Sequence, residues 1–477
     1  MNVKSALRTL LQGKMNLRLF PLYFLAAGVV SLLFLAALNK TYNMDEFEHV
    51  HSAWYIVHGF VPYRDFFQHH NPLMWYLIAP VIALAGENAG ILISLRVAMF
   101  ALALSTSAAA AAIAGKVSSR SEAPWYCLVL LLSCVLFVEK AVEIRPDVPM
   151  TLFGTLSVYF FIRHHDSANP RDMVLSGMCA ATAFLFLQKA VFLYAALSVL
   201  VVVKAARKEM PMKTLLLFFL CLLAGPAMIF AFYASQGVLY DYYLNGYLLN
   251  ASKIYSFSAW EFLRRSFSRN AGFWVLAVAG ILYGTVTFRR NEKLGTLSLL
   301  GVMLFLPVLF VKTPWKQYYL PALALLSAVG ACFLARVLEK ARLGALLGVM
   351  LMAVIILKPM LFLAQYRENR NRSQIELAAF VAENTRAGDL VYDGKNEFNL
   401  FRRDLHYFWY STGKNRNLSV YNALTGNRYG DYDVCSLISE KRPRVISDYL
   451  VDKKDCSVLR RYTRIDGFDV YMETGRP

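Results

Sequence analysis

Long apolar blocks run through the first three quarters of this 477-residue chain. A block of about 20 apolar residues is long enough to cross a bilayer core of ~30 Å as an α-helix. Hydrophobic residues make up 57% of the sequence, compared with roughly 45–50% in soluble proteins. The pattern excludes a soluble fold and predicts a mainly α-helical bundle that crosses the membrane many times.

The blocks and their flanks predict about 11 membrane-spanning helices. A basic segment at 1–18 precedes an apolar run at 19–38 that is too long for a cleaved signal peptide, so we place the N-terminus in the cytoplasm. With that start, all five cytoplasmic connections are basic, as the positive-inside rule requires. The remaining predicted spans are 91–114, 124–139, 148–162, 172–187, 190–204, 214–234, 271–288, 295–311, 317–337 and 343–363.

The formal net charge of +18 does not indicate nucleic acid as a partner. Lys and Arg lie mainly in short loops between the apolar blocks, where they set the topology and attract anionic lipid head groups. The sequence carries no nucleic-acid-binding motif. It therefore predicts an integral, multi-pass membrane protein whose partners include membrane lipids.

The composition changes near residue 365, which predicts a transmembrane domain at 1–364 and a soluble extracytoplasmic α/β domain at 365–477. In the second domain, we expect Cys435 and Cys456 either to form a disulfide or to stay as two free buried thiols. Local patterns in this domain predict one amphipathic helix and three short strands, at 373–384, 390–393, 444–448 and 468–472.

The first outer loop carries the densest group of candidate site residues. Asn43 and Glu46 have the spacing of a capping box, and apolar residues at helical spacing predict an interfacial helix at 44–58. A second interfacial stretch is predicted at 72–85. Asp45 lies on the polar face of the first helix. Either Asp45 and Glu46 are catalytic carboxylates, or they only favour the start of the helix through its macrodipole.

Five of the eight histidines fall between residues 49 and 70. Together with nearby carboxylates, His49 and His70 are candidate ligands of a divalent metal, although their spacing is not a zinc signature. The alternative is that these histidines only form hydrogen bonds at the interface. We therefore predict no definite cofactor and leave a divalent metal open.

Several cations lie at membrane depth or in outer loops, and an anionic lipid phosphate would explain Lys312 and Lys316. Cations at membrane depth face a cavity or a charged partner by default, with snorkelling toward the interface as the alternative. In the second outer loop, which also contains Asp147, the alternative is a solvated hairpin with local ion pairs. The cations are Arg96, Arg145, Lys189, Lys312 and Lys316.

These segments resemble the GT-C superfamily of membrane glycosyltransferases, particularly the branch of the protein O-mannosyltransferases and the lipid A aminoarabinose transferase. The resemblance covers roughly residues 15–365. It depends on the order of the segments and on their common side of the membrane. The segments are Asp45-Glu46, the run from Pro62-Tyr63-Arg64-Asp65 to His69-His70-Asn71-Pro72, Arg145-Pro146-Asp147, Gln188-Lys189, and the run from Lys312 to Pro321.

The resemblance implies an enzyme that moves a sugar from a polyprenyl-phosphate donor to a lipid, glycan or protein acceptor on the outer side of the membrane. It implies Asp45, beside Glu46, as the general base or the acceptor-positioning carboxylate, and Asp147 as its counterpart in the second loop. The residues implied to hold the donor phosphate are Arg145, Lys189, Lys312 and Lys316. The residues implied to line the substrate are His49, Tyr63, Arg64, His69 and His70.

A single attack at the anomeric carbon would invert its configuration, and we expect inversion from the resemblance. The main rival function is a transporter or flippase of a lipid-linked saccharide, which would also have many spans and buried cations. A structural subunit of an envelope assembly is a second rival. We expect the chain to lie in a bacterial inner membrane, with its C-terminal domain outside the cytoplasm.

Overall fold

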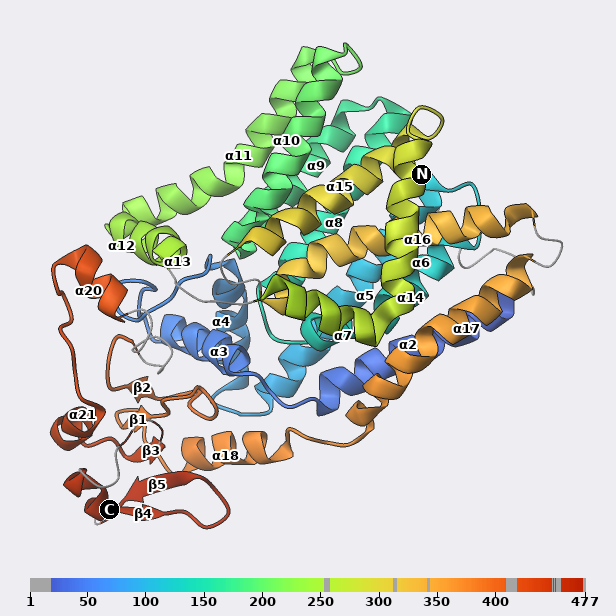
Figure 1. Ribbon diagram of the computed structural model, residues 1–477. Helices are drawn as coiled ribbons and strands as arrows, with labels where there is room; N and C mark the ends of the chain where they lie inside the picture. Colours follow the sequence, from blue (N-terminus) through green and yellow to red (C-terminus); the bar gives the residue numbers. More distant parts are fainter. Residues whose placement is uncertain are drawn as a thin grey trace.

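The computed structural model describes residues 19–252, 258–311, 315–340, 344–408, 418–447, 449, 451 and 456–474. A bundle of long helices makes up most of the molecule, and a small sheet with its own helices lies beside one end of the bundle (Figure 1). The sequence therefore predicted the fold class correctly at this level: mainly helical, with a small α/β part near the C-terminus.

Seven helical segments among the described residues are long and apolar enough to cross a membrane. Three further helices coincide with predicted spans at 148–162, 172–187 and 271–288: α8 (Asp147–Ser167), α9 (Pro170–Phe186) and α14 (Ala259–Val286). The count of 11 spans and their orientation stay predictions. The seven segments contain α2 (Phe20–Asn39), α5 (Ile91–Val117), α10 (Val191–Ala206), α11 (Met212–Ser235), α15 (Glu292–Phe310), α16 (Leu320–Val337) and α17 (Gly344–Leu363).

Glycines allow two of these helices to pack at backbone distance. Gly225 of α11 faces α9, where a Cβ built on it would lie 2.7 Å from the carbonyl oxygen of Ala181. Gly177 of α9 faces α11 in the same way, because its Cβ would lie 2.7 Å from the carbonyl oxygen of Phe218. A residue with a side chain at either position would push the two helices apart.

The predicted span at 124–139 is not one straight helix. It consists of α6 (Ala123–Ser133) and α7 (Val135–Ala141), which are bent by 71° at the break between them. The backbone N–H of Val135 donates to the side-chain oxygen of Asn270 in α14 at 3.0 Å, so a partner outside the helix holds the start of α7. This bend turns α7 out of line with α6 and toward the site described below.

The first outer loop forms the two predicted interfacial helices, α3 (Met44–Val57) and α4 (Leu73–Ala85). The capping box at the start of α3 is present, with Asn43 and Glu46 each bonded to the other's backbone N–H. Thirteen residues make α4 too short to cross a bilayer. The segment after α11 contains α12 (Leu239–Tyr243), the π-helical turn η3 (Leu244–Leu248) and α13 (Leu249–Ser252).

The C-terminal part contains a five-stranded sheet in the order β2-β1-β3-β5-β4. Strands β2, β1 and β3 are parallel, and β5 pairs antiparallel with both β3 and β4. The three predicted strands are present, while β2 and β4 were not predicted. The elements of this part are α18 (Arg372–Glu383), β1 (Leu390–Tyr392), β2 (Arg403–Asp404), α20 (Ser419–Thr425), α21 (Val434–Lys441), β3 (Val445–Ser447), β4 (Tyr462–Arg464) and β5 (Val470–Glu473).

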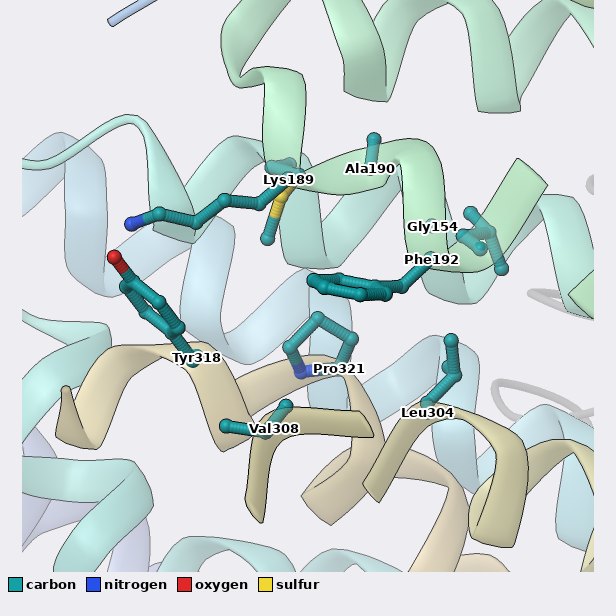
Figure 2. A pocket seen from close by; sticks show the side chains of 10 residues that line it. Gly154, Lys189, Ala190, Phe192, Leu304, Val308, Tyr318 and Pro321 are labelled. Carbon is teal, nitrogen blue, oxygen red and sulfur yellow. The ribbon is translucent and has the colours of Figure 1, made fainter. Parts of the chain in front are cut away.

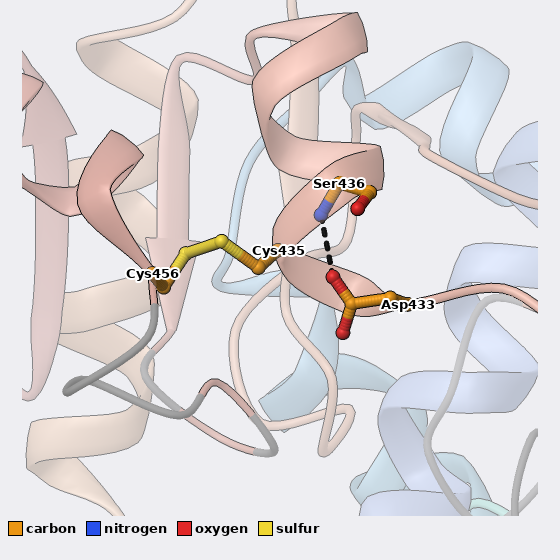
Figure 3. Close-up of a disulfide and its surroundings, with 4 residues drawn as sticks. All are labelled: Asp433, Cys435, Ser436 and Cys456. Carbon is orange, nitrogen blue, oxygen red and sulfur yellow. Dashed lines mark hydrogen bonds between the residues drawn. A yellow bond between two sulfur atoms is a disulfide. The ribbon is translucent and has the colours of Figure 1, made fainter.

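Cys435 of α21 and Cys456 form a disulfide, which decides between the two alternatives that the sequence left open (Figure 3). Asp433 caps the N-terminus of α21 by accepting the backbone N–H of Ser436 at 2.7 Å. The disulfide therefore ties a capped helix to the segment that leads into β4.

The sheet is joined to the first outer loop through α3. Asp404 of β2 accepts hydrogen bonds from His51 at 2.7 Å and from Tyr55 at 2.9 Å, and all three side chains are buried. The hydroxyl of Tyr407 donates to the backbone carbonyl of Tyr63 at 2.7 Å. Residues around 400–408 thus share one hydrophobic core with the helices. The domain division at residue 365 itself stays a prediction.

Candidate active site

A cavity of about 1230 Å³ lies between the first outer loop, α7, the start of α10, η3 and α13, and the first part of α14. Its lining contains both carboxylates and cations, and it collects residues from segments that are far apart in the sequence. The candidate residues that line it are Asp45, His69, His70, Arg145, Lys189 and Lys316. Lys312 lies outside the described residues.

Asp45 and Arg145 form an ion pair in the lining of the cavity. The cap residue Asn43 fixes the first turn of α3 by accepting the backbone N–H of Asp45 at 3.1 Å. The side chain of Asp45 is 30% exposed and accepts a hydrogen bond from Arg145, which is buried. Asp45 is therefore a carboxylate that a ligand in the cavity can reach, while a fixed guanidinium holds its orientation.

Arg145 is surrounded by three carboxylates. Besides Asp45, its guanidinium lies 3.4 Å from Asp147 and 3.5 Å from Glu143. Burial opposes the charge, but these carboxylates raise the pKa of Arg145. Lys40 and then Lys140 lower the pKa of the buried Glu143. In the structure the Arg145 guanidinium contacts carboxylates of the protein, and its predicted binding of phosphate stays a prediction.

Lys189 lies in the 3₁₀ turn η2 (Gln188–Ala190), the interruption between α9 and α10 that the sequence indicated. Its ammonium group is 3.4 Å from the carboxylate of the buried Asp147 and 3.7 Å from the centre of the Tyr318 ring. Asp147 does not itself line the cavity. It contacts both Arg145 and Lys189, and so it links Lys189 to the pair of Asp45 and Arg145.

Lys189 and Tyr318 also stand at a smaller, mainly apolar pocket of about 30 Å³ between α8, α10, α15 and α16. Figure 2 shows the Lys189 side chain reaching toward the Tyr318 hydroxyl, with Phe192 and Pro321 on the apolar side. Lys189, Tyr318 and Phe192 line both spaces. A charged group near Lys189 therefore has the larger cavity, with its charged side chains, on one side and an apolar pocket on the other.

A second group of cations lines the cavity at α14 and at the 3₁₀ turn η4 (Lys316–Tyr319). Arg269 of α14 and Lys316 both face Glu139 of α7, at 3.4 Å and 3.3 Å. Lys316 was among the predicted site residues, and Arg269 was not. One carboxylate thus holds two cations from different segments together.

Glu46 is placed differently from its predicted catalytic role. It does not line the cavity, and its side chain is fully buried against Arg96, at 2.6 Å and 2.8 Å. Its two oxygens also accept the backbone N–H groups of Asn43 and Ile144 at 2.9 Å and 3.0 Å. The carboxylate therefore joins α3, α5 and the second outer loop, and Arg96 faces a charged partner rather than snorkelling.

Tyr63 and Arg64 do not line the cavity, although they were predicted to. The Tyr63 ring packs against aromatic side chains of α11 and α12, and its hydroxyl donates to the backbone carbonyl of His70. Arg64 is largely exposed and pairs with its neighbour Asp65. Tyr63 thus supports the chain at His70, and the resemblance alone could not separate this support from a contact to the substrate.

His49 is buried beneath the cavity and does not line it. Its Nδ1 accepts a hydrogen bond from the Trp75 indole N–H at 2.9 Å, and burial lowers its pKa to about 3. The rings of His49 and His70 are 5.8 Å apart. In the part of the chain that the structure describes, no group of three or more His, Cys, Asp or Glu side chains is placed to hold a metal ion.

Sequence reasoning missed the residues that η3 and α13 contribute. Tyr247 and Asn250 line the cavity. Asn250 donates to the backbone carbonyl of His69 at 2.8 Å, and Gln188 donates to the same oxygen at 2.8 Å. The signal that could have found them is the polar and aromatic run from Tyr240 to Asn250, directly after a predicted outer helix end.

Comparisons with known proteins support the predicted fold. Residues 69–230 match a family model described as dolichyl-phosphate-mannose-protein mannosyltransferase. The structure is similar to that of ArnT from Cupriavidus metallidurans bound to undecaprenyl phosphate, with a TM-score of 0.68 at 13% identity over 94% of this chain and 97% of that chain. No curated protein sequence matches the chain.

A second similar structure is the oligosaccharyltransferase AglB from Archaeoglobus fulgidus in complex with an inhibitory peptide and a dolichol-phosphate. Its TM-score is 0.55 at 11% identity, over 91% of this chain and 69% of that chain. The resemblance seen in the sequence is thereby confirmed: this chain has the fold of the GT-C superfamily of membrane glycosyltransferases.

Proposed function

We propose that this protein is a glycosyltransferase that moves a sugar from a polyprenyl-phosphate donor to an acceptor hydroxyl on the outer side of the membrane. The observation that carries the proposal is the pairing, in one cavity, of a reachable carboxylate at Asp45 with the cation Lys189 beside an apolar pocket. The solved structures with undecaprenyl phosphate and dolichol-phosphate, both isoprenoid phosphates on the same fold, support this class of donor.

The chemistry of such a transfer fits the two sides of the cavity. The acceptor oxygen forms a bond to the anomeric carbon while the bond from that carbon to the phosphate oxygen breaks, and polyprenyl phosphate leaves. Lys189, Lys316 and Arg269 are fixed cations that would stabilise the charge that develops on the phosphate. Asp45 would accept the proton of the acceptor hydroxyl, a contribution that is typically about 10²–10⁴-fold in rate.

Direct attack of the acceptor would invert the anomeric configuration, because no covalent sugar–enzyme intermediate is formed. In this proposal Arg145 orients Asp45, and Asp147 positions Arg145 and Lys189 relative to each other. Neither residue needs to touch the substrate. Comparison of the anomeric configuration of donor and product by NMR tests this step, and retention would contradict it.

The proposed location is a multi-pass position in a bacterial inner membrane, with the cavity and the C-terminal part outside the cytoplasm. The Cys435–Cys456 disulfide supports this orientation, because disulfides persist in oxidising compartments and are rare in the cytosol. Labelling of single introduced cysteines from either side of intact cells would test it. Labelling of the C-terminal part only from inside would reverse the orientation.

The transferase proposal is tested with purified wild type and the Asp45→Asn variant. Each protein is incubated with a panel of polyprenyl-phosphate sugars and acceptors, and released polyprenyl phosphate is measured by mass spectrometry. The wild type should release it only when acceptor is present, and Asp45→Asn should be slower by about 10²-fold or more. Asp65→Asn is the matched control, because Asp65 pairs with Arg64 and does not line the cavity.

The outcomes separate the possible failures. Equal release by the wild type and Asp45→Asn would keep the enzyme and remove Asp45 from the mechanism. If the wild type moved a lipid-linked saccharide across a vesicle membrane and released no polyprenyl phosphate from any donor, the transferase proposal would be wrong and a transporter would replace it.

A further inference from the structure

We propose that Asn270 binds the phosphate of the donor through its side-chain amide N–H. The assignment rests on the proposed function and adds to it a neutral hydrogen-bond donor that neither the sequence nor the comparisons indicated. Asn270 lines the cavity and is only 2% exposed.

Asn270 lies at a break in a helix. Its backbone angles, φ −138° and ψ 41°, are not helical and interrupt α14 between Arg269 and the apolar second part of the helix. The part before the break contributes Arg265, Ser266 and Arg269 to the cavity lining. The break thus separates a polar, cavity-lining half from the apolar half that continues into the bundle.

The orientation of the Asn270 amide is fixed by its partner in α7. The backbone N–H of Val135, at the first position of α7, has no acceptor within its own helix and donates to the Asn270 side-chain oxygen at 3.0 Å. Because an N–H group needs an oxygen, this bond assigns the carbonyl end of the amide to Val135 and leaves the NH₂ end for another partner.

Among the residues that the structure describes, the NH₂ end has no hydrogen-bond partner. The Asn270 side-chain nitrogen is buried and makes no hydrogen bond to any of the residues that the structure describes. A buried donor without an acceptor is unfavourable and uncommon in native proteins. Since Asn270 lines the cavity, an oxygen atom of a ligand in the cavity would supply the missing acceptor.

The charges around Asn270 indicate which oxygen this is. Arg269 is its chain neighbour, and Lys316 is held next to Arg269 by Glu139 at 3.3 Å. Cations at this wall favour an anionic oxygen, whereas the hydroxyl groups of an acceptor or sugar suit the carboxylate of Asp45, which lies in α3. The geometry therefore points to a phosphate oxygen.

Asn270→Asp is the informative variant. Aspartate has nearly the same shape and can still accept the Val135 N–H, so the helix break keeps its partner, but the donor is replaced by an acceptor. Asn250→Asp is the matched control. It adds the same charge to the same cavity, at a residue whose amide already donates to the backbone carbonyls of His69 and Gly246.

The full-length protein in nanodiscs is titrated with undecaprenyl phosphate and, separately, with undecaprenol, and binding is followed by tryptophan fluorescence. Asn270→Asp should bind undecaprenyl phosphate at least 10-fold more weakly than the wild type and bind undecaprenol unchanged. Asn270→Asp should also bind undecaprenyl phosphate at least threefold more weakly than Asn250→Asp does. If Asn270→Asp does not fold, Asn270→Ala is judged by the same ratio of the two affinities.

Three results would overturn the assignment. If Asn270→Asp bound undecaprenyl phosphate as tightly as the wild type does, the amide would make no contact with the phosphate. An equal loss in both variants would show a general effect of charge in the cavity. If the wild type itself did not bind undecaprenyl phosphate, both the proposed function and this assignment would be wrong. The first two results concern the variants and overturn this assignment alone.

Discussion

Replacing Arg96 with methionine should destabilise the protein strongly, because it leaves the Glu46 carboxylate buried without its cation. The pair is fully buried, and Arg96 also donates to the backbone carbonyls of Lys40 and Thr41. Removing one partner of a buried ion pair costs about 3–5 kcal/mol, far more than the pair itself contributes, because the remaining charge is uncompensated. We therefore expect Arg96→Met to lower the free energy of unfolding by about 3–5 kcal/mol.

A second substitution tests the reasoning. In the Arg96→Met background, Glu46→Gln removes the uncompensated carboxylate charge and leaves an oxygen that can still accept one backbone N–H. The double variant should therefore be more stable than Arg96→Met by about 1 kcal/mol or more, within the 0.5–3 kcal/mol range of coupling between residues in contact.

The assay is reversible unfolding in mixed micelles with increasing amounts of dodecyl sulfate, followed by tryptophan fluorescence. Arg64→Met is the control, because Arg64 forms a largely exposed pair with Asp65, and such pairs contribute little. A loss below about 1 kcal/mol for Arg96→Met, or a double variant as unstable as the sum of the single variants, would refute the argument.

Three further predictions concern stability. Burial lowers the pKa of His49 from its ordinary value of 6.5 to about 3, so the stability that the neutral side chain contributes is complete above pH 6.5 and is lost as the pH falls toward 3. His49→Asn should flatten this dependence in melting curves recorded against pH. Replacing Cys435 and Cys456 by serine removes a disulfide between residues 21 positions apart and should lower the free energy of unfolding by about 3 kcal/mol. An unchanged melting temperature would contradict this. Gly225→Ala should lower the free energy of unfolding by about 1–3 kcal/mol, because its Cβ would meet the Ala181 carbonyl oxygen in α9. A variant as stable as the wild type would show that the two helices can move apart without cost.

Local sequence patterns predicted much of the fold. The capping residues Asn43 and Glu46 correctly predicted the first residue of α3, because a capping box depends only on two residues three positions apart. The interruption at Gln188-Lys189 was visible as two polar residues in an apolar run, and it brings Lys189 into the cavity. Charge patterns likewise placed Asp45 and Arg145 in outer loops, and the two side chains meet in the structure.

The sequence did not predict features that depend on a distant partner. At the helix break, the backbone N–H of Val135 bonds to Asn270, which is 135 positions away, so local patterns did not show the bend within the span predicted at 124–139. They also did not show that Glu46 pairs with Arg96, which lies 50 positions further along the chain. Strands β2 (Arg403–Asp404) and β4 (Tyr462–Arg464) contain no aliphatic residue, whereas the predicted strands β1 and β3 are rich in Val, Leu and Ile.

The contact between α3 and β2 has a consequence for the timing of biosynthesis. His51 and its partner Asp404 are separated by 353 positions. At a synthesis rate of about 5–20 residues per second, α3 waits roughly 20–70 s before the ribosome has added its partner. During that interval a nascent chain has its first outer loop without the support of β2. The helix that contributes Asp45 to the cavity would thus gain its contact with β2 only after translation reaches the last fifth of the chain.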